Sequence, residues 1–173
     1  MAYDIVPVWR NVTPELQAEL AAFWMSHNAI PDAERANARA LQAVCVLRDA
    51  DGALCGVATA VVKVIPRLRQ PTYYFRQFIA PAHRQQQQAL PIFRAACAIL
   101  EAANKSAPES LGVLLEVENP DLARVFSHAI GARTGAAFIG YSPRGHQLRV
   151  VYFQGAKLFP PAPLRRRQAP AAA

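Results

Sequence analysis

The stretch that decides the fold is "FIAPAHRQQQQALPIFRAACAIL", residues 78–100. It begins at the end of an apolar run and continues through a proline, a His-Arg pair and four glutamines. Apolar residues then resume at spacings of three and four, which indicates a strand, a polar connection and a helix. The next apolar run, "SLGVLLEVEN" at residues 110–119, is nearly continuous, as expected for a buried central strand. The order strand, helix, strand predicts two parallel strands joined by a right-handed crossover.

The rest of the chain fits around this unit. Residues 43–80 contain β-branched runs separated by "DADG" and "IPRLRQP", which predicts a three-stranded antiparallel meander. Leu122 to Ile130 carry apolar residues at the spacing of an amphipathic helix, and Gly131 is expected to end it. The remaining expected elements are a strand at 3–9, helices at 13–27 and 32–42, and two strands within 132–155.

The predicted fold class is α/β (α+β), with a single mixed central sheet of about seven strands and helices on both faces. The chain has 173 residues, of which 53% are hydrophobic and 18% charged, which suits one domain with a sizeable core. We expect that domain to span residues 1–155. No apolar run approaches the roughly 20 residues that cross a bilayer, so we expect a soluble cytoplasmic protein with no membrane partner. Cys45, Cys55 and Cys97 form no CxxC pair and are expected in the core.

The charge is concentrated near the end of the chain. Three of the formal net +7 charges come from Arg165, Arg166 and Arg167, which leaves a body of only +4. Residues 156–173 are rich in proline and alanine, and we expect a disordered extension there. Basic residues interleaved with aromatic ones, or a known binding motif, would indicate a nucleic-acid partner. Neither pattern is present, so we expect no nucleic-acid binding.

The order of elements resembles the GNAT superfamily of N-acyltransferases. "FIAPAHRQQQQAL" is similar to the family's acyl-CoA pyrophosphate loop, with Arg84 at its Arg/Gln position, Gln87 at its first glycine and Ala89 at its last small residue. "LLEVENPDLARVFSHAIGAR" resembles the second signature, with Glu116, then Asn119, then a helix. The resemblance implies transfer of an acyl group from acetyl-CoA or another acyl-CoA to a small-molecule or peptide amine.

The resemblance also implies site residues. Glu116 would be the general base that deprotonates the amine. The strand backbone at Phe78, Ile79 and Ala80, together with Asn119, would hold the pantetheine arm. The diphosphate would lie on the loop and the helix N-terminus that follow, formed by Arg84, Gln85, Gln86, Gln87, Gln88 and Ala89.

Two departures from the family pattern leave the function open. Gln87 brings a side chain to a position where glycine lets the backbone approach the diphosphate, and Ser127 stands where a tyrosine usually protonates the leaving thiolate. The alternative is therefore a non-catalytic GNAT-like binding or scaffold domain, as a monomer or a homodimer. Structural roles also compete: a salt-bridged Glu116, a helix-capping Asn119 and an Arg84 that only solvates its loop. The histidines have no metal-ligand spacing, so no metal is expected.

Overall fold

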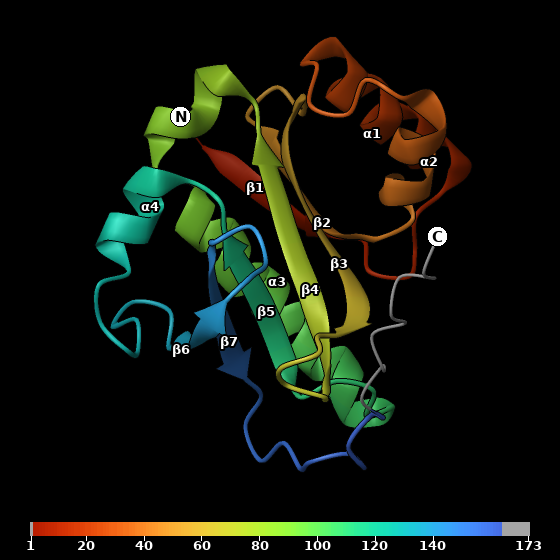
Figure 1. Cartoon of the computed structure of the whole chain (residues 1–173). Helices are drawn as coiled ribbons and strands as arrows, with labels where there is room; N and C mark the ends of the chain where they lie inside the picture. Colours follow the sequence, from red (N-terminus) through yellow and green to blue (C-terminus); the bar gives the residue numbers. More distant parts are fainter. Residues whose placement is uncertain (1, 164–173) are drawn as a thin grey trace, which may run out of the picture.

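A computed structural model describes residues 2–163 and shows one seven-stranded sheet in the order β1-β2-β3-β4-β5-β7-β6 (Figure 1). The strands are β1 Tyr3–Pro7, β2 Ala43–Asp49, β3 Leu54–Val64, β4 Pro71–Ile79, β5 Gly112–Val117, β6 Ala137–Tyr141 and β7 Gln147–Tyr152. The helices are α1 Pro14–Ser26, α2 Ala33–Ala40, the short 3-10 helix η1 Pro81–Gln86, α3 Ala89–Ser106 and α4 Pro120–Val125. The predicted single mixed sheet is confirmed.

Helices cover both faces of the sheet, as predicted. On one face, α1 and α2 pack over β2 and β3, and Leu20 and Trp24 of α1 lie in the core. The side chain of Thr13 accepts a hydrogen bond from Leu16 N and Pro14 occupies the first turn, so the sequence sets where α1 begins. On the other face, α3 places Ile92 and Leu100 in the second core cluster.

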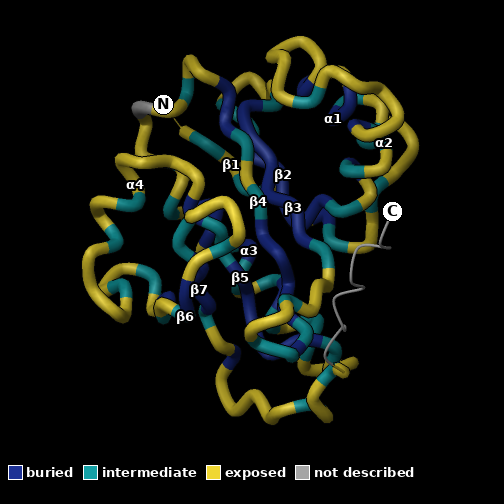
Figure 2. Tube along the Cα trace, in the orientation of Figure 1, coloured by how far each residue is buried: buried dark blue, intermediate teal, exposed yellow. Residues whose placement is uncertain are grey.

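The strand pairing follows the expected topology. Strands β2, β3 and β4 form the antiparallel meander, and β4 pairs in parallel with β5 after the crossover through α3. The buried residues form a continuous band along β2, β3, β4, β5 and β7 (Figure 2). Cys45 and Cys55 are buried as expected, whereas Cys97 on α3 is only half-buried. No helix among the described residues is both long and apolar enough to span a membrane.

The helix expected from Leu122 to Ile130 is wrong in its length. Helix α4 ends at Val125, and Val125 and Ile130 are 71% and 64% exposed because no element among residues 2–163 covers their apolar side. An amphipathic pattern forms a stable helix only where its apolar face is buried. Gly131 is not a helix cap but the first residue of a tight turn, in which Gly135 N donates to Gly131 O at 2.7 Å.

Part of the expected disordered extension is ordered. The side chain of Gln70, only 6% exposed, donates to Phe159 O at 2.9 Å and accepts from Phe159 N at 2.8 Å. Arg69 Nε likewise donates to Ala162 O at 2.7 Å. The boundary expected at residue 155 is therefore too early, because residues 156–163 pack against the turn before β4. The other residues of that expected extension, 164–173, lie outside the described residues.

Candidate functional site

The parallel strands β4 and β5 separate before they end. Their pairing covers only Tyr73–Phe75 against Val113–Leu115, although β4 continues to Ile79 and β5 to Val117. The two strands therefore splay apart beyond Phe75 and Leu115. It leaves one side of the last part of β4 without a neighbouring strand, and we call this opening the β4/β5 gap.

The register shows which backbone groups face the β4/β5 gap. Ala80 N donates to Cys55 O of β3 at 2.9 Å, and backbone groups in an antiparallel pair alternate in direction. The N–H and C=O groups of Phe78 and Ala80 therefore point toward β3, whereas those of Gln77 and Ile79 point into the gap. Of the three residues predicted to bind pantetheine through their backbone, only Ile79 is placed to do so. Gln77 was missed, although strand alternation alone would have found it.

The predicted pyrophosphate loop is a 3-10 helix followed directly by α3. Residues 81–86, including Gln85 and Gln86, form η1, and Gln87 then takes the left-handed conformation with φ 55° and ψ 24°. Glycine adopts this region without steric cost, whereas a residue with a Cβ pays roughly 1 kcal/mol. Gln87 thus keeps the glycine-like backbone that the family motif requires, and the departure lies only in its side chain.

The first turn of α3 offers backbone donors that have no acceptor within the helix. Within the described residues no side chain caps it, and Gln88 instead donates through Nε2 to Gln86 O at 2.9 Å. Ala89 and Leu90 begin the helix with N–H groups that have no intrahelical acceptor, while Pro91 has no N–H to leave unpaired. The positive end of the helix dipole adds to these donors, so the turn can hold an anion.

Arg84 lies between this turn and the β4/β5 gap. Its Nε donates to Ile79 O at 3.0 Å, and its guanidinium carbon lies 5.7 Å from the centre of the Phe78 ring. The side chain is otherwise exposed. Arg84 therefore does more than solvate the loop. It donates to the carbonyl of Ile79, the last residue of β4, and so covers a backbone group that faces the β4/β5 gap.

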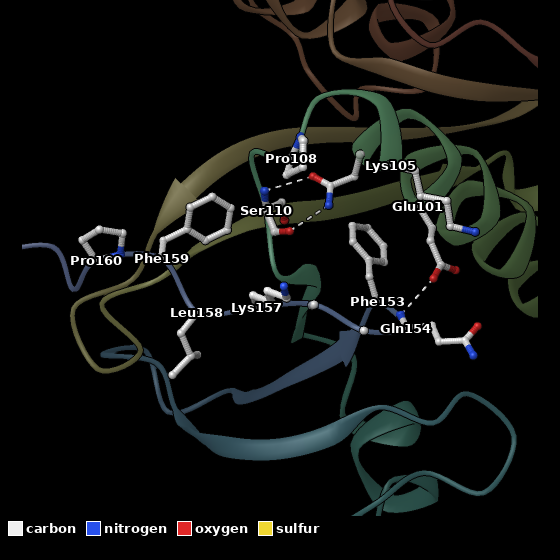
Figure 3. A pocket seen from close by; sticks show the side chains of 13 residues that line it. Glu101, Lys105, Pro108, Ser110, Phe153, Gln154, Lys157, Leu158, Phe159 and Pro160 are labelled. Atoms are coloured by element: carbon white, nitrogen blue, oxygen red, sulfur yellow. Dashed lines mark hydrogen bonds between the residues drawn. The ribbon is translucent and has the colours of Figure 1, made fainter.

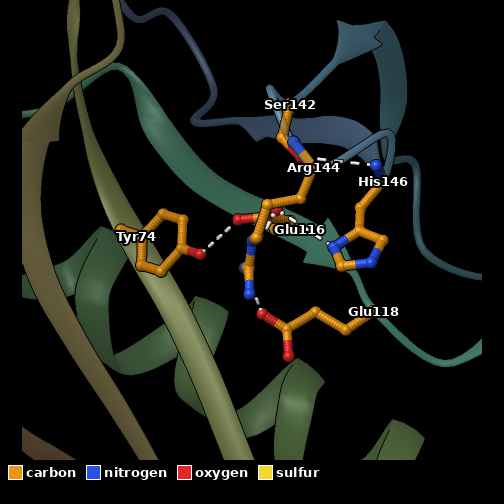
Figure 4. Close-up of polar contacts among 6 residues, drawn as sticks. All are labelled: Tyr74, Glu116, Glu118, Ser142, Arg144 and His146. Atoms are coloured by element: carbon orange, nitrogen blue, oxygen red, sulfur yellow. Dashed lines mark hydrogen bonds and ion pairs between the residues drawn. The ribbon is translucent and has the colours of Figure 1, made fainter.

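Glu116 is the centre of a polar network on the α1/α2 face of the sheet (Figure 4). Tyr74 of β4 donates its hydroxyl to Oε2 at 2.5 Å, while Arg144 and His146 contact Oε1 at 3.0 and 3.2 Å. The register explains the convergence, since Tyr74 pairs with Leu114 and Glu116 pairs with Leu148. Residues two apart on a strand share a face, so Tyr74, Glu116 and His146 all point the same way.

This network makes Glu116 a poor base. Burial raises the pKa of its carboxyl, but the hydrogen bonds from Tyr74, Ser142, Arg144 and His146 outweigh burial and lower that pKa to about 2. The carboxylate side chain is only 9% exposed. A carboxylate this weakly basic holds a proton too poorly to act as a general base near pH 7. The hydrogen bonds therefore hold Glu116 as an anion that organises its neighbours, and its expected role as the general base stays a prediction.

His146 is the better candidate for the base. Because Glu116 is ionised at neutral pH and can only accept, the hydrogen bond between them places the proton on His146 Nδ1. In the neutral form of the ring Nε2 then carries the free electron pair, and Figure 4 shows this nitrogen on the side of the ring away from Glu116. The side chain is 32% exposed. Sequence reasoning missed His146, although its position two residues before an apolar strand run places it on the Glu116 face.

Asn119 and Ser127 have structural positions. Asn119 Oδ1 accepts from Asp121 N at 2.8 Å and from Leu122 N at 3.4 Å, so it caps α4 and is not free to hold a ligand through that oxygen. Ser127 follows α4 on the surface, and its hydroxyl contacts the neighbouring His128 Nδ1 at 3.3 Å. Neither residue takes part in the Glu116 network.

A cavity of about 380 Å³ lies elsewhere, between the C-terminal half of α3 and residues 153–160 (Figure 3). It borders Ser110, just before β5 begins, and thus lies at the opposite end of β5 from Glu116. Its lining includes Phe153, Leu158 and Phe159, but none of the network or loop residues. The Glu116 network and the predicted pyrophosphate loop therefore both lie outside this cavity.

Comparison with known proteins identifies the architecture. No protein-family model matches the sequence, and no curated protein matches it in sequence. A GNAT-family acetyltransferase structure from Streptococcus pneumoniae matches with a TM-score of 0.61 and 12% identity, over 88% of this chain and 99% of the other. A Pyrococcus horikoshii protein matches at 0.56 with 9% identity, over 87% and 98%. The spermidine/spermine N-acetyltransferase of Vibrio cholerae matches at 0.51 with 14% identity, over 87% and 92%. The chain therefore has a GNAT-type acetyltransferase fold.

Proposed function

We propose that this protein transfers an acyl group from a coenzyme A thioester to an amine. The observation that carries the proposal is the β4/β5 gap, into which the backbone groups of Gln77 and Ile79 point. An extended chain that contains amides can add to such a strand by main-chain hydrogen bonds. The pantetheine arm of coenzyme A has this chemistry, so the gap fits the donor.

The loop fits the other end of the same donor. The first turn of α3 provides backbone donors at Ala89 and Leu90, and Arg84 provides a guanidinium group suited to phosphate oxygens. Arg84 at present bonds Ile79 O. If Arg84 turns to a diphosphate, it releases that carbonyl into the β4/β5 gap, so the two halves of the donor site become available together.

The acceptor side is built by the Glu116 network. A bound acyl-CoA supplies a thioester, in which a C–S bond breaks as the amine nitrogen forms the new C–N bond. His146 Nε2 accepts the proton that the amine loses, and Glu116 holds the ring in the required tautomer and stabilises the charged imidazolium. A thiolate with a pKa near 8.5 leaves without an acid, which is consistent with a serine at position 127.

The choice of an amine as acceptor rests on chemistry and on likeness. A histidine whose free nitrogen faces the surface can take a proton from an ammonium or an amine near neutral pH. The Vibrio cholerae neighbour is named for acetylation of the amines spermidine and spermine. We therefore propose an amine, on a small molecule or a peptide, as the acceptor class.

Titration calorimetry with acetyl-CoA, and then with longer acyl-CoA thioesters, tests the proposal. We expect saturable binding and a raised melting temperature, since ligand at a hundredfold excess over Kd stabilises the native state by about 2.7 kcal/mol. Arg84→Ala should weaken binding roughly 10- to 100-fold, the loss of one charge-assisted hydrogen bond. Lys105→Ala removes the same charge from the far end of α3 and should bind as the wild type does. No binding at millimolar concentrations of any thioester would favour the non-catalytic alternative.

A further inference from the structure

Three cations gather on the sheet face beside the Glu116 network. Lys63 of β3 and Arg76 of β4 lie against one ring, and the charge of Arg39 near the end of α2 is close enough to lower the pKa of Lys63; we call these three residues the basic cluster. Lys63 Nζ lies 4.4 Å and Arg76 Cζ 4.6 Å from the centre of the Tyr74 ring. The register explains this arrangement. Val61 pairs with Tyr74, and Lys63 of β3 and Arg76 of β4 lie on the same face, each two residues from that pair and on opposite sides of it, so both reach the Tyr74 ring.

The basic cluster has no carboxylate of its own. Among the ion pairs of residues 2–163, none involves Arg39, Lys63 or Arg76. The carboxylates of Glu116 and Glu118, which lie next to it, are both bound to Arg144. Four cations, counting Arg144, therefore face two carboxylates, and this part of the surface carries an uncompensated positive charge.

The electrostatics show that these cations disfavour one another. Burial lowers the pKa of Arg39 to about 10, with a further contribution from the charge of Arg76. Burial also lowers the pKa of Lys63, and again Arg76 and Arg39 add to the effect. Glu118 and Glu116 oppose these shifts only in part. An anion placed among the three groups would relieve their repulsion, and the free cluster contains none.

The basic cluster is connected to the proposed base through one side chain. The Tyr74 ring lies against Lys63 and Arg76, while its hydroxyl donates to Glu116, which in turn holds His146. Tyr74 and Glu116 thus join the basic cluster to His146. The donor loop, by contrast, lies beyond the end of β4, so the cluster is separate from Arg84 and the first turn of α3.

We propose that the amine acceptor carries a carboxylate or phosphate group, which the basic cluster binds while the amine lies at His146. This inference rests on the proposed acyl transfer and adds the class of acceptor. Arg76 and Arg39 would supply planar forks of donors and exposed Lys63 a mobile point charge. A polycation such as spermidine would meet repulsion at the same surface, so this chain should not share the acceptor of its spermidine-acetylating neighbour.

The test is a matched series of primary amines with chains of three to six carbons, each ending in a carboxylate, phosphate, hydroxyl or ammonium group. Release of the coenzyme A thiol gives kcat/KM with acetyl-CoA. We expect the carboxylate or phosphate members to exceed the hydroxyl members by about tenfold or more, as one charge-assisted contact provides, and the ammonium members to be poorest. The better of the two anions identifies the group. Equal rates for hydroxyl and anionic members would overturn the inference.

Single-residue variants test whether the basic cluster is the source of the preference for anionic acceptors. Lys63→Gln and Arg76→Gln should each reduce the anion preference about tenfold, while Arg76→Lys should keep part of it. Lys105→Gln, with the same change of charge, should leave the preference intact. If the cluster variants instead weaken acetyl-CoA binding and leave the preference unchanged, the cluster serves the donor and the inference is wrong.

A binding measurement keeps the inference separate from the proposed reaction. The N-acetylated products of the carboxylate, phosphate and hydroxyl amines are titrated into the coenzyme A complex, or into the free protein if coenzyme A does not bind. Stronger binding of anionic products, lost in Lys63→Gln, supports the basic cluster even without turnover. Failure of coenzyme A to bind would count against the proposed function alone, whereas indifference to the anionic group would count against the acceptor class alone.

Discussion

Replacement of Glu116 by glutamine removes the anion that Tyr74, Arg144 and His146 contact, and its effect on stability can be worked out from the structure. A pKa that falls from an ordinary 4.5 to about 2 corresponds to roughly 3 kcal/mol of native-state stabilisation at neutral pH. Arg144, one of the partners, is 57% exposed, so solvent screening reduces this figure to about 2 kcal/mol. The neutral amide that replaces the carboxylate can still accept from Tyr74 but cannot form an ion pair with Arg144.

The loss of stability in Glu116→Gln should depend on pH, and the lowered pKa of Glu116 fixes the direction of that dependence. Because the pKa of Glu116 is lowered by folding, its contribution is complete above the unfolded value near 4.5 and disappears as the pH falls toward 2. Urea unfolding at pH 6 should therefore show Glu116→Gln about 2 kcal/mol less stable than wild type, with a difference below about 1 kcal/mol at pH 3. Glu118→Gln, whose carboxylate is 56% exposed, should lose under 1 kcal/mol at either pH. Equal stability of Glu116→Gln and wild type at pH 6 would refute the anchored carboxylate.

The remaining predictions concern single side chains. His146→Ala should lower kcat about 10²- to 10⁴-fold at pH 7 and recover in part at high pH, where free amine no longer needs a base, and unchanged rates would remove His146 from the mechanism. Ser127→Ala should change turnover less than twofold; abolished turnover in a folded variant would make that serine the leaving-group acid. Gln87→Gly should change the melting temperature little, because relief of the left-handed strain offsets the added unfolded-state entropy, and calorimetry should show tighter acetyl-CoA binding. Gln70→Ala should cost about 1 to 3 kcal/mol in urea unfolding and speed amide exchange at Phe159, whereas unchanged exchange would mean that Gln70 does not fix the C-terminal segment.

The strand order and the crossover could be predicted because local patterns specify them. The switch of apolar spacing around residues 78–100 required a strand, a connection and a helix, and parallel pairing followed from the crossover. The length of α4 could not be predicted in the same way. An apolar stripe from Leu122 to Ile130 needs a surface to cover, and the pattern does not reveal whether one is present.

The candidate site, too, could be predicted from the sequence only in part. The loop and Arg84 lie in one contiguous motif, so their place at the end of β4 could be read from the sequence. The role of Glu116 depended on Tyr74 of β4 and on Arg144 and His146 of the turn before β7, two distant parts of the chain that meet only through strand register. Their combined effect on the pKa of Glu116 arises because they lie close together in the folded protein, and a sequence motif does not show which distant residues will be close.

The central claim is that acyl-CoA binds in the β4/β5 gap, and amide hydrogen exchange along β4 with and without saturating coenzyme A tests it most directly. The account predicts that the amides of Gln77 and Ile79, which face the gap, become protected when the ligand binds. Phe78 and Ala80, already directed toward β3, serve as internal controls and should change little. Unchanged exchange at Gln77 and Ile79 with the ligand bound, or protection confined to another part of the molecule, would contradict the claim.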